Sequence, residues 1–208
     1  MNRQTRNVAL PRTSSIILRL RDRARYVAGH ASARIAIVVF AIATLVFTAL
    51  LMLPAASANG TRTPLPDAFF TAVSAVTVTG LTTVNTSEHW SMFGQVVILT
   101  AIQTGALGVV TIALLLAMMV TRRLGVSGRV FAKESIGTSG IGDVKRLLRV
   151  VVVTTFTIEA ALAVFLVPAF VIAEESFWWG LWHGVFYAVS AFANAGFTSH
   201  SDGLGSFA

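Results

Sequence analysis

The chain has no cysteine, which excludes disulfide bonds and metal sites built on thiolates. It also has little charge, since 12% of its 208 residues are charged and only nine are acidic. A typical soluble domain carries about twice that charged fraction. Apolar residues make up 55% of the chain, and its mean hydropathy is +0.75. This composition excludes an ordinary soluble domain and predicts an all-α membrane protein.

Basic residues are concentrated in two segments that flank hydrophobic runs. Eight of the sixteen Lys and Arg residues lie in 1–34, and seven lie in 121–149. Cytoplasmic segments next to membrane spans are enriched in Lys and Arg, so we expect both segments, and hence the N-terminus, in the cytoplasm. The net charge of +7 therefore reports topology and contact with the lipid bilayer, and we expect no nucleic acid as a partner. An RNA-binding tail is the alternative interpretation of the basic arm.

Three hydrophobic runs have the length of membrane spans: 35–53, 91–120 and 150–173. The first has 19 residues and would cover about 28 Å as a helix, close to the ~30 Å hydrocarbon core. A signal peptide is the alternative for this run, because Ala56-Ser57-Ala58 resembles a cleavage site. The run is longer than signal peptides require, and further spans follow it, so we interpret it as a span.

The second run is longer than the bilayer requires, so we expect it to tilt or to bend near Gly105 and Gly108. Aromatic side chains lie beside the spans, where indoles suit the membrane interface. We expect an interfacial position for Trp90 and an aromatic belt formed by Phe177-Trp178-Trp179 with Trp182.

A polar, glycine-containing turn occurs twice at an offset of 116 residues. Ser74-Ala75-Val76-Thr77-Val78-Thr79-Gly80-Leu81-Thr82 pairs with Ser190-Ala191-Phe192-Ala193-Asn194-Ala195-Gly196-Phe197-Thr198. Short helices are expected before the turns, from Asp67 to about Val76 and from about Leu181 to Phe192. Each covers roughly half a bilayer at 1.5 Å per residue, so neither can cross alone. The repeat predicts two re-entrant loops in duplicated membrane units.

The two turns suit a dehydrated cation. Backbone carbonyls can replace its water without burying negative charge, and a helix that ends at the turn presents its negative pole. Gly80 and Gly196 are the natural pivots, because glycine adopts backbone conformations that other residues disfavour. The candidate ligands are the carbonyls of Thr77, Val78, Thr79, Gly80, Ala193, Asn194, Ala195 and Gly196. A tight turn within a helical hairpin is the alternative.

Two polar residues are expected at membrane depth, Gln103 in the second span and Glu159 in the third. A buried acid is costly, so Glu159 should face protein or water and have a partner. We interpret it as a structural hydrogen bond or a protonated carboxyl, with an ion-pathway role as the alternative. For Gln103, a bond between helices and a pore-facing role both stay open.

An intramembrane enzyme is a further alternative, with Glu159 and one of the four histidines as acid and base. The histidines fall in or near the flanks of the spans, and neither a nucleophile–base spacing nor a metal motif occurs. We therefore do not expect an enzyme.

At these residues the sequence resembles the bacterial Trk/Ktr potassium uptake family, most of all the membrane subunit of the Ktr type. The resemblance rests on the order span, short helix, glycine turn, span, and then a second unit with Ser-Ala-Phe-Ala-Asn-Ala-Gly-Phe. Ile102 to Gly108 also matches the family's glycine-rich span motif, with Ala106 in place of a glycine, and marks Gly105 and Gly108 as pore or packing support. Ala193 stands where the family often has Asn.

The resemblance implies potassium uptake through a filter of backbone carbonyls, in a protein with four span–pore–span repeats around one pore. Such proteins lie in the bacterial plasma membrane, work with a cytoplasmic nucleotide-binding regulatory subunit and form homodimers when full length. Potassium would be the substrate, and no cofactor or other metal is implied. The expected divisions are a basic arm 1–34, a first repeat 35–121, a linker 122–149 and a second repeat 150–208.

Only two of the four repeats are present, and the second lacks its closing span. We therefore expect the chain to act as part of a longer or assembled transporter. A non-conducting truncated or accessory membrane protein is the alternative function.

Overall fold

The computed structural model describes residues 34, 36–121, 141–201, 203 and 205. Apart from Arg34, the basic arm lies outside these residues, as does most of the expected linker. The chain divides into two compact units, 1–39 and 40–208, and the description below concerns the second.

The described part of the chain is helical. An isolated antiparallel bridge between Ser57 and Trp90 is its one β-type pairing outside the helices. The elements are a first helix Ala36–Leu51, η1 Pro54–Ala56, α2 Leu65–Val76, α3 Thr86–His89, α4 Met92–Thr121, α6 Ile141–Glu174 and α7 Phe177–Phe192.

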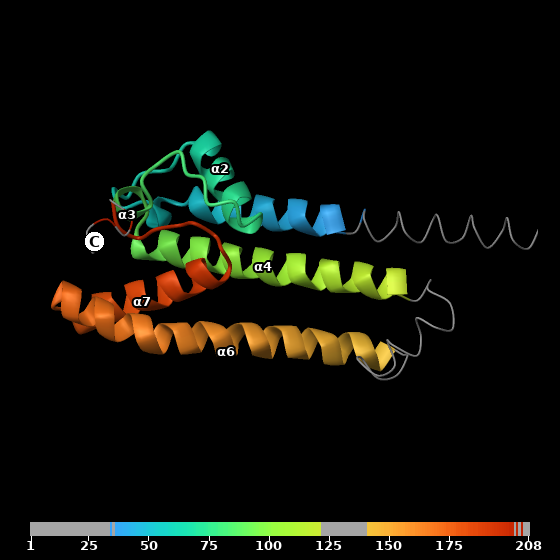
Figure 1. Ribbon diagram of the computed structural model, residues 1–208. Coiled ribbons are helices and arrows are strands. Elements are labelled where there is room, and N and C mark those ends of the chain that lie inside the picture. The colour runs from blue at the N-terminus through green and yellow to red at the C-terminus, as the bar shows by residue number, and fades with distance from the viewer. Residues whose placement is uncertain (1–33, 35, 122–140, 202, 204, 206–208) are drawn as a thin grey trace, which may run out of the picture. The chain divides into compact units, whose positions relative to one another are not determined.

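Two helices contain apolar segments long enough to cross a membrane, Met92–Leu114 in α4 and Arg146–Glu174 in α6. The first helix is apolar but shorter over its described length. α4 is a continuous helix of 30 residues, and Figure 1 shows no break in it near Gly105 or Gly108. α6 begins at Ile141, earlier than the predicted 150, because the amphipathic segment before the apolar run continues the same helix.

The short helices α2 and α7 precede the two turns, as predicted. α2 has Pro66 and Asp67 in its first turn, where a missing amide hydrogen is harmless and an acid opposes the positive helix end. α7 has 16 residues rather than the expected 12, because Phe177 to Gly180 also belong to the helix. At 1.5 Å per residue the helices measure about 18 Å and 24 Å, so neither spans a ~30 Å bilayer.

α4 lies between α2 on one side and the α6–α7 hairpin on the other (Figure 1). Glycines allow the two helices of the hairpin to approach closely. A Cβ added at Gly184 would lie 2.6 Å from Cγ2 of Val167, and one added at Gly180 would overlap the backbone of Val171. The hairpin therefore folds α7 tightly back along α6.

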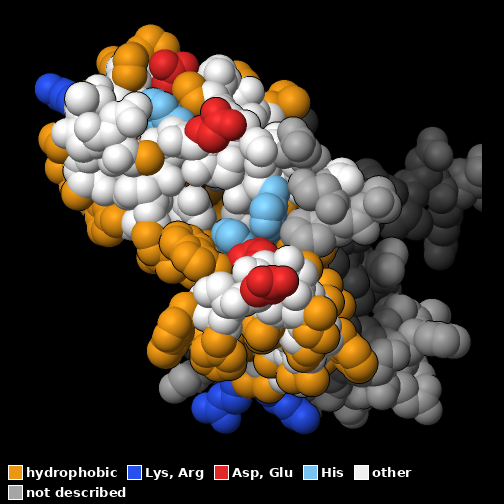
Figure 2. Space-filling view, turned by 90° about the vertical axis from the view of Figure 1, so that its left-hand side faces the viewer, with side chains coloured by type: hydrophobic (Ala, Val, Ile, Leu, Met, Phe, Trp, Pro, Cys, Tyr) orange, Lys and Arg blue, Asp and Glu red, His pale blue; other side chains and the backbone are white. Residues whose placement is uncertain are grey.

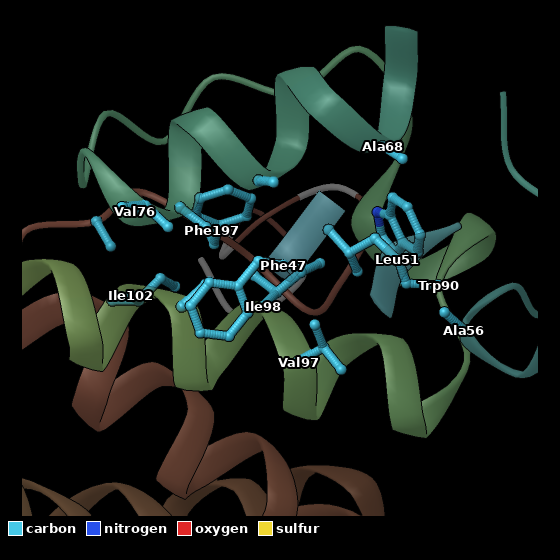
Figure 3. Close-up of a cluster of buried hydrophobic side chains, with 14 of the residues drawn as sticks. Phe47, Leu51, Ala56, Ala68, Val76, Trp90, Val97, Ile98, Ile102 and Phe197 are labelled. Atoms are coloured by element: carbon cyan, nitrogen blue, oxygen red, sulfur yellow. The ribbon is translucent and has the colours of Figure 1, made fainter. Parts of the chain in front are cut away.

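The main hydrophobic core fills the space between α2, α4 and the end of the first helix (Figure 3). Leu51, Ile98 and Ile102 are fully buried there. Phe197 also belongs to this cluster, although it follows the second turn, and Figure 3 places it beside Val76. The segment after the second glycine turn is thus anchored in the core formed by the first helix, α2 and α4.

The interfacial position expected for Trp90 is wrong, because its side chain is only 1% exposed. The bridge to Ser57 holds its backbone against the segment after the first helix, and the amide of Ser91 donates to Ala56 O at 2.9 Å. The indole therefore enters the core. Phe177, Trp178 and Trp179 are exposed, as an aromatic belt would be.

Large apolar side chains remain exposed along the long helices, and Figure 2 shows apolar side chains around the borders of one end of the molecule. Phe165 and Ile172 on α6 are 78% and 79% exposed. In water such surface would be unfavourable, whereas lipid or neighbouring protein accommodates it.

Replacing Ile98 by Ala should lower the free energy of unfolding by about 2 to 5 kcal/mol, because the change leaves a cavity in a close-packed core. The matched control is Ile172→Ala on the exposed side of α6, which should change stability by about 0.5 kcal/mol or less. Unfolding of both variants in detergent micelles measures the difference. Equal effects would contradict the assignment of the core.

Candidate functional site

The two glycine turns have the same backbone conformation. Thr77 and Ala193, which follow α2 and α7, have right-handed values with φ of −87° and −71°. The next residues, Val78 and Asn194, are left-handed with φ of 56° and 54°. The sequence repeat is therefore also a repeat of structure.

The hydrogen bonds that end the two short helices are also equivalent. The amide of Thr79 donates to Ser74 O at 2.8 Å, and the amide of Ala195 donates to Ser190 O at 2.7 Å. Inside each of these bonds a second one runs across three residues, as in a Schellman motif. The turn amides thus satisfy carbonyls that the helix ends would otherwise leave without partners.

This use of the turn amides orients the turn carbonyls. In a trans peptide the N–H and C=O groups point in opposite directions. Because the amides of Val78 and Thr79 point back into α2, the carbonyls of Thr77 and Val78 point away from it. Within the described ranges, no hydrogen bond ends on any of the eight predicted ligand carbonyls, those of Thr77, Val78, Thr79, Gly80, Ala193, Asn194, Ala195 and Gly196.

Gly80 and Gly196 bring the two turns together. They have φ of 79° and 71°, in the region that favours glycine. A Cβ added at Gly196 would lie 3.4 Å from the Cα of Gly80, and one added at Gly80 would overlap the carbonyl oxygen of Ala195. Two segments that lie far apart in the sequence therefore meet at their glycines, where there is no room for a side chain.

The left-handed conformations of Val78 and Asn194 were not predicted from the sequence. Asn adopts this region fairly often, but a β-branched Val there is an outlier with a strain of about 1 to 3 kcal/mol. The alignment of Val78 with Asn194 was the available signal, because both occupy the same place in the repeat. The strained valine marks the first turn as a segment held in place by its surroundings.

Gly105 and Gly108 contribute to packing on α4. A Cβ at Gly105 would overlap the carbonyl oxygen of Val76, so the absence of a side chain lets the end of α2 rest directly on α4. A Cβ at Gly108 would lie 3.2 Å from the Phe40 ring. α4 continues as a helix through both glycines.

Gln103 and Glu159 are partners. The Gln103 side-chain amide donates to Glu159 Oε2 at 3.1 Å, which joins α4 to α6. Glu159 is 5% exposed, so the partner that a buried acid was expected to need is present. Its other oxygen, Oε1, and Oε1 of Gln103 are buried without a hydrogen bond in the described structure. A protonated Glu159 could donate to the Gln103 oxygen and complete the pair.

A second polar link between helices was missed by the sequence reasoning. Trp182 donates from Nε1 to Gln95 Oε1 at 2.8 Å, and the side-chain nitrogen Nε2 of Gln95 donates to Trp90 O at 3.3 Å. Trp182 therefore ties α7 to α4 rather than completing the aromatic belt. Tryptophans at the ends of spans have the same sequence context in both roles, so the pattern could not separate them.

A hydroxyl hydrogen bond closes the second turn. Ser190 donates to Phe197 O at 2.8 Å, which fixes the chain as it leaves Gly196. In the first turn, Thr77 Oγ1 lies 2.7 Å from Thr79 Oγ1 and donates to Val73 O. These side-chain hydrogen bonds help to fix the two turns at the ends of α2 and α7.

Comparison with known proteins supports a transport role. The TrkH family, described as a cation transport protein, matches residues 15–208. The chain is 40% identical over 159 residues to the potassium/sodium uptake protein NtpJ of Enterococcus hirae, over 74% of this chain and 34% of that protein.

It is 36% identical over 170 residues to the Ktr system potassium uptake protein B of Bacillus subtilis, over 81% of this chain and 37% of that protein. A protein of the same name from Vibrio alginolyticus is 36% identical over 158 residues, or 76% and 34% of the two chains. The chain thus spans about a third of the length of the curated relatives it matches.

The family match covers all of the described residues, including both glycine turns and the helices before them. The family transports cations, which makes the alternative of an intramembrane enzyme wrong. Its match, the apolar helices and the all-helical structure agree on a membrane location. The chain belongs to the TrkH family of cation transport proteins.

Proposed function

We propose that the chain supplies two filter segments of a pore through which potassium ions are taken up, as part of a longer or assembled transporter. The potassium ligands are the carbonyls of the two turns, Thr77 to Gly80 and Ala193 to Gly196. The observation that carries the proposal is that both turns share one backbone conformation, meet at Gly80 and Gly196, and have carbonyls that accept no hydrogen bond from the described residues.

The chemistry of the turns fits a monovalent cation. Neutral carbonyls replace water around the ion and bind it weakly enough for it to leave again. The C-terminal ends of α2 and α7 add negative potential at the turns. The membrane potential supplies about 2.3 kcal/mol per charge for each 100 mV, so inward movement needs no covalent chemistry.

The orientation of the protein follows from its charges. Arg146 and Arg149 lie near the start of the span in α6, whereas Glu174 and Glu175 lie at its other end. By the positive-inside rule, this charge distribution supports a cytoplasmic N-terminus and a cytoplasmic start of α6, in a protein of the bacterial plasma membrane. The acidic ends of the helices then face outward.

The wider assembly is proposed from the family resemblance. In this proposal, 35–121 and 150–208 are two of the repeats around the pore, joined by the linker 122–149 after a basic arm 1–34. The complete protein forms a homodimer and is regulated by a cytoplasmic nucleotide-binding subunit.

Potassium uptake is tested by growth rescue of cells that lack their own potassium uptake systems. The chain is expressed alone, and in parallel it is extended by the reading frame downstream of Ala208. We expect rescue by the extended form, because a ring of carbonyls needs all its segments. Rescue by neither form, with both proteins present in the membrane, would contradict the proposal and favour a non-conducting accessory protein.

Gly80→Ser in the complete protein should lower the preference for potassium over sodium about tenfold or more. Its side chain would overlap the Ala195 carbonyl and displace a predicted ligand. Ion fluxes in proteoliposomes measure the preference. The matched control is Gly60→Ser, because Gly60 also has a left-handed φ of 66° but has open space around it. Unchanged selectivity in Gly80→Ser would remove the turn from the filter.

The pair of Gln103 and Glu159 is proposed as packing support rather than part of the ion path. Glu159→Gln should then keep potassium flux within about twofold, since an amide can still accept from Gln103. Gln103→Leu should lower stability by about 1 to 3 kcal/mol, because it leaves the buried Glu159 without its donor. Flux and unfolding are measured on the same preparations. Loss of flux in a stable Glu159→Gln protein would instead place the carboxyl in the ion path.

A further inference from the structure

Three side chains of metal-ligating type meet where the span in α6 ends and α7 begins. Glu174 is the last residue of α6, His183 lies in α7, and His200 follows the second turn by four residues. One ligand atom from each lies within 4.8 Å of the others. In Figure 2, histidine side chains lie next to acidic side chains in the middle of the face shown.

The contacts within this cluster converge on one oxygen. Glu174 Oε1 lies 2.5 Å from His183 Nδ1 and 3.3 Å from His200 Nε2. The three side chains are 16%, 12% and 19% exposed, so they are largely withdrawn from solvent but still accessible to it. The ring of Phe170 stacks on His200 at 5.8 Å and forms an apolar wall.

Tyr187 contacts the nitrogen of His200 that faces away from Glu174. Its hydroxyl oxygen lies 3.0 Å from His200 Nδ1 and 3.5 Å from Gly203 O. Nε2 is therefore the His200 nitrogen that faces the Glu174 carboxylate, at 3.3 Å.

A metal ion suits these three donors, because one ligand atom of each already lies within 4.8 Å of the others. A hydrogen-bond partner at the second ring nitrogen, as Tyr187 is to His200 Nδ1 here, also orients histidine ligands in metal sites.

We propose that Glu174, His183 and His200 bind a divalent transition cation of the zinc type, with water as the fourth ligand. Two imidazoles and one carboxylate are a donor set that zinc accepts, whereas calcium and magnesium prefer oxygen alone. Bonds of about 2.0 to 2.1 Å in a tetrahedron place the ligand atoms about 3.3 Å apart. The separation of Glu174 and His200 already has this value, and the shorter contact to His183 opens when the metal enters.

The bound metal would connect three segments of the second repeat. Through Glu174 it holds the end of the span, through His183 the short helix, and through His200 the segment that leaves the second glycine turn. Binding to the folded protein alone stabilises it by mass action. The site lies outside the two turns and does not depend on which ion passes through them.

The test is zinc titration of the purified full chain in detergent micelles, after removal of metals with a chelator, by isothermal titration calorimetry. We expect one zinc ion per chain, no comparable heat with magnesium, and a thermal midpoint that rises with zinc concentration. Glu174→Gln and His200→Ala should each weaken binding at least tenfold.

Two matched controls replace residues of the same types outside the cluster. Glu175→Gln changes the adjacent carboxylate, and His89→Gln changes a histidine that lies against Thr63 instead. Both should bind zinc as the unchanged chain does. No binding by the unchanged chain, or equal binding by Glu174→Gln and Glu175→Gln, would overturn the proposal.

Cobalt(II) provides a readout that does not depend on the variants. The unchanged chain should develop the visible absorption of tetrahedral cobalt, and added zinc should remove it. Absorption typical of six-coordinate cobalt would contradict the three-ligand site.

Discussion

The arrangement of the two glycine turns depends on how the C-terminal ends of α2 and α7 satisfy their backbone hydrogen bonds. Each helix end has carbonyls that need donors, and in both cases the amides of the following turn supply them. The same hydrogen bonds point the carbonyls of Thr77 and Val78 away from α2. The turn amides therefore satisfy the helix ends, and the turn carbonyls accept no hydrogen bond within the described part of the chain.

The contact between the turns constrains everything around it. Gly80 and Gly196 are in contact, so the C-terminal ends of α2 and α7, which belong to different repeats, must lie close together. α4 makes this possible, because Gly105 lets the end of α2 rest on it and Gln95 receives Trp182 from α7. The hydrogen bond from Gln103 to Glu159 then joins α6 to α4 as well.

Much of this arrangement could be predicted from the sequence. The spans follow from uncharged runs, and the turns follow from the pairing of Ser74–Thr82 with Ser190–Thr198. Features that depend on tertiary contacts could not be predicted. Trp90 is equally compatible with an interface and a core, and only the bridge to Ser57 places it inside. Glu174, His183 and His200 carry no spacing motif, because a loop and two helices bring them together.

The position of Phe197 has a consequence for how such units associate. Phe197 belongs to the second repeat, but its side chain is 1% exposed and lies in the core formed by helices of the first repeat. Leu81, its equivalent in the first repeat, is 61% exposed. The contact between the two repeats is therefore not two-fold symmetric, because the first repeat buries a side chain from the second without a reciprocal insertion of Leu81 among the described residues.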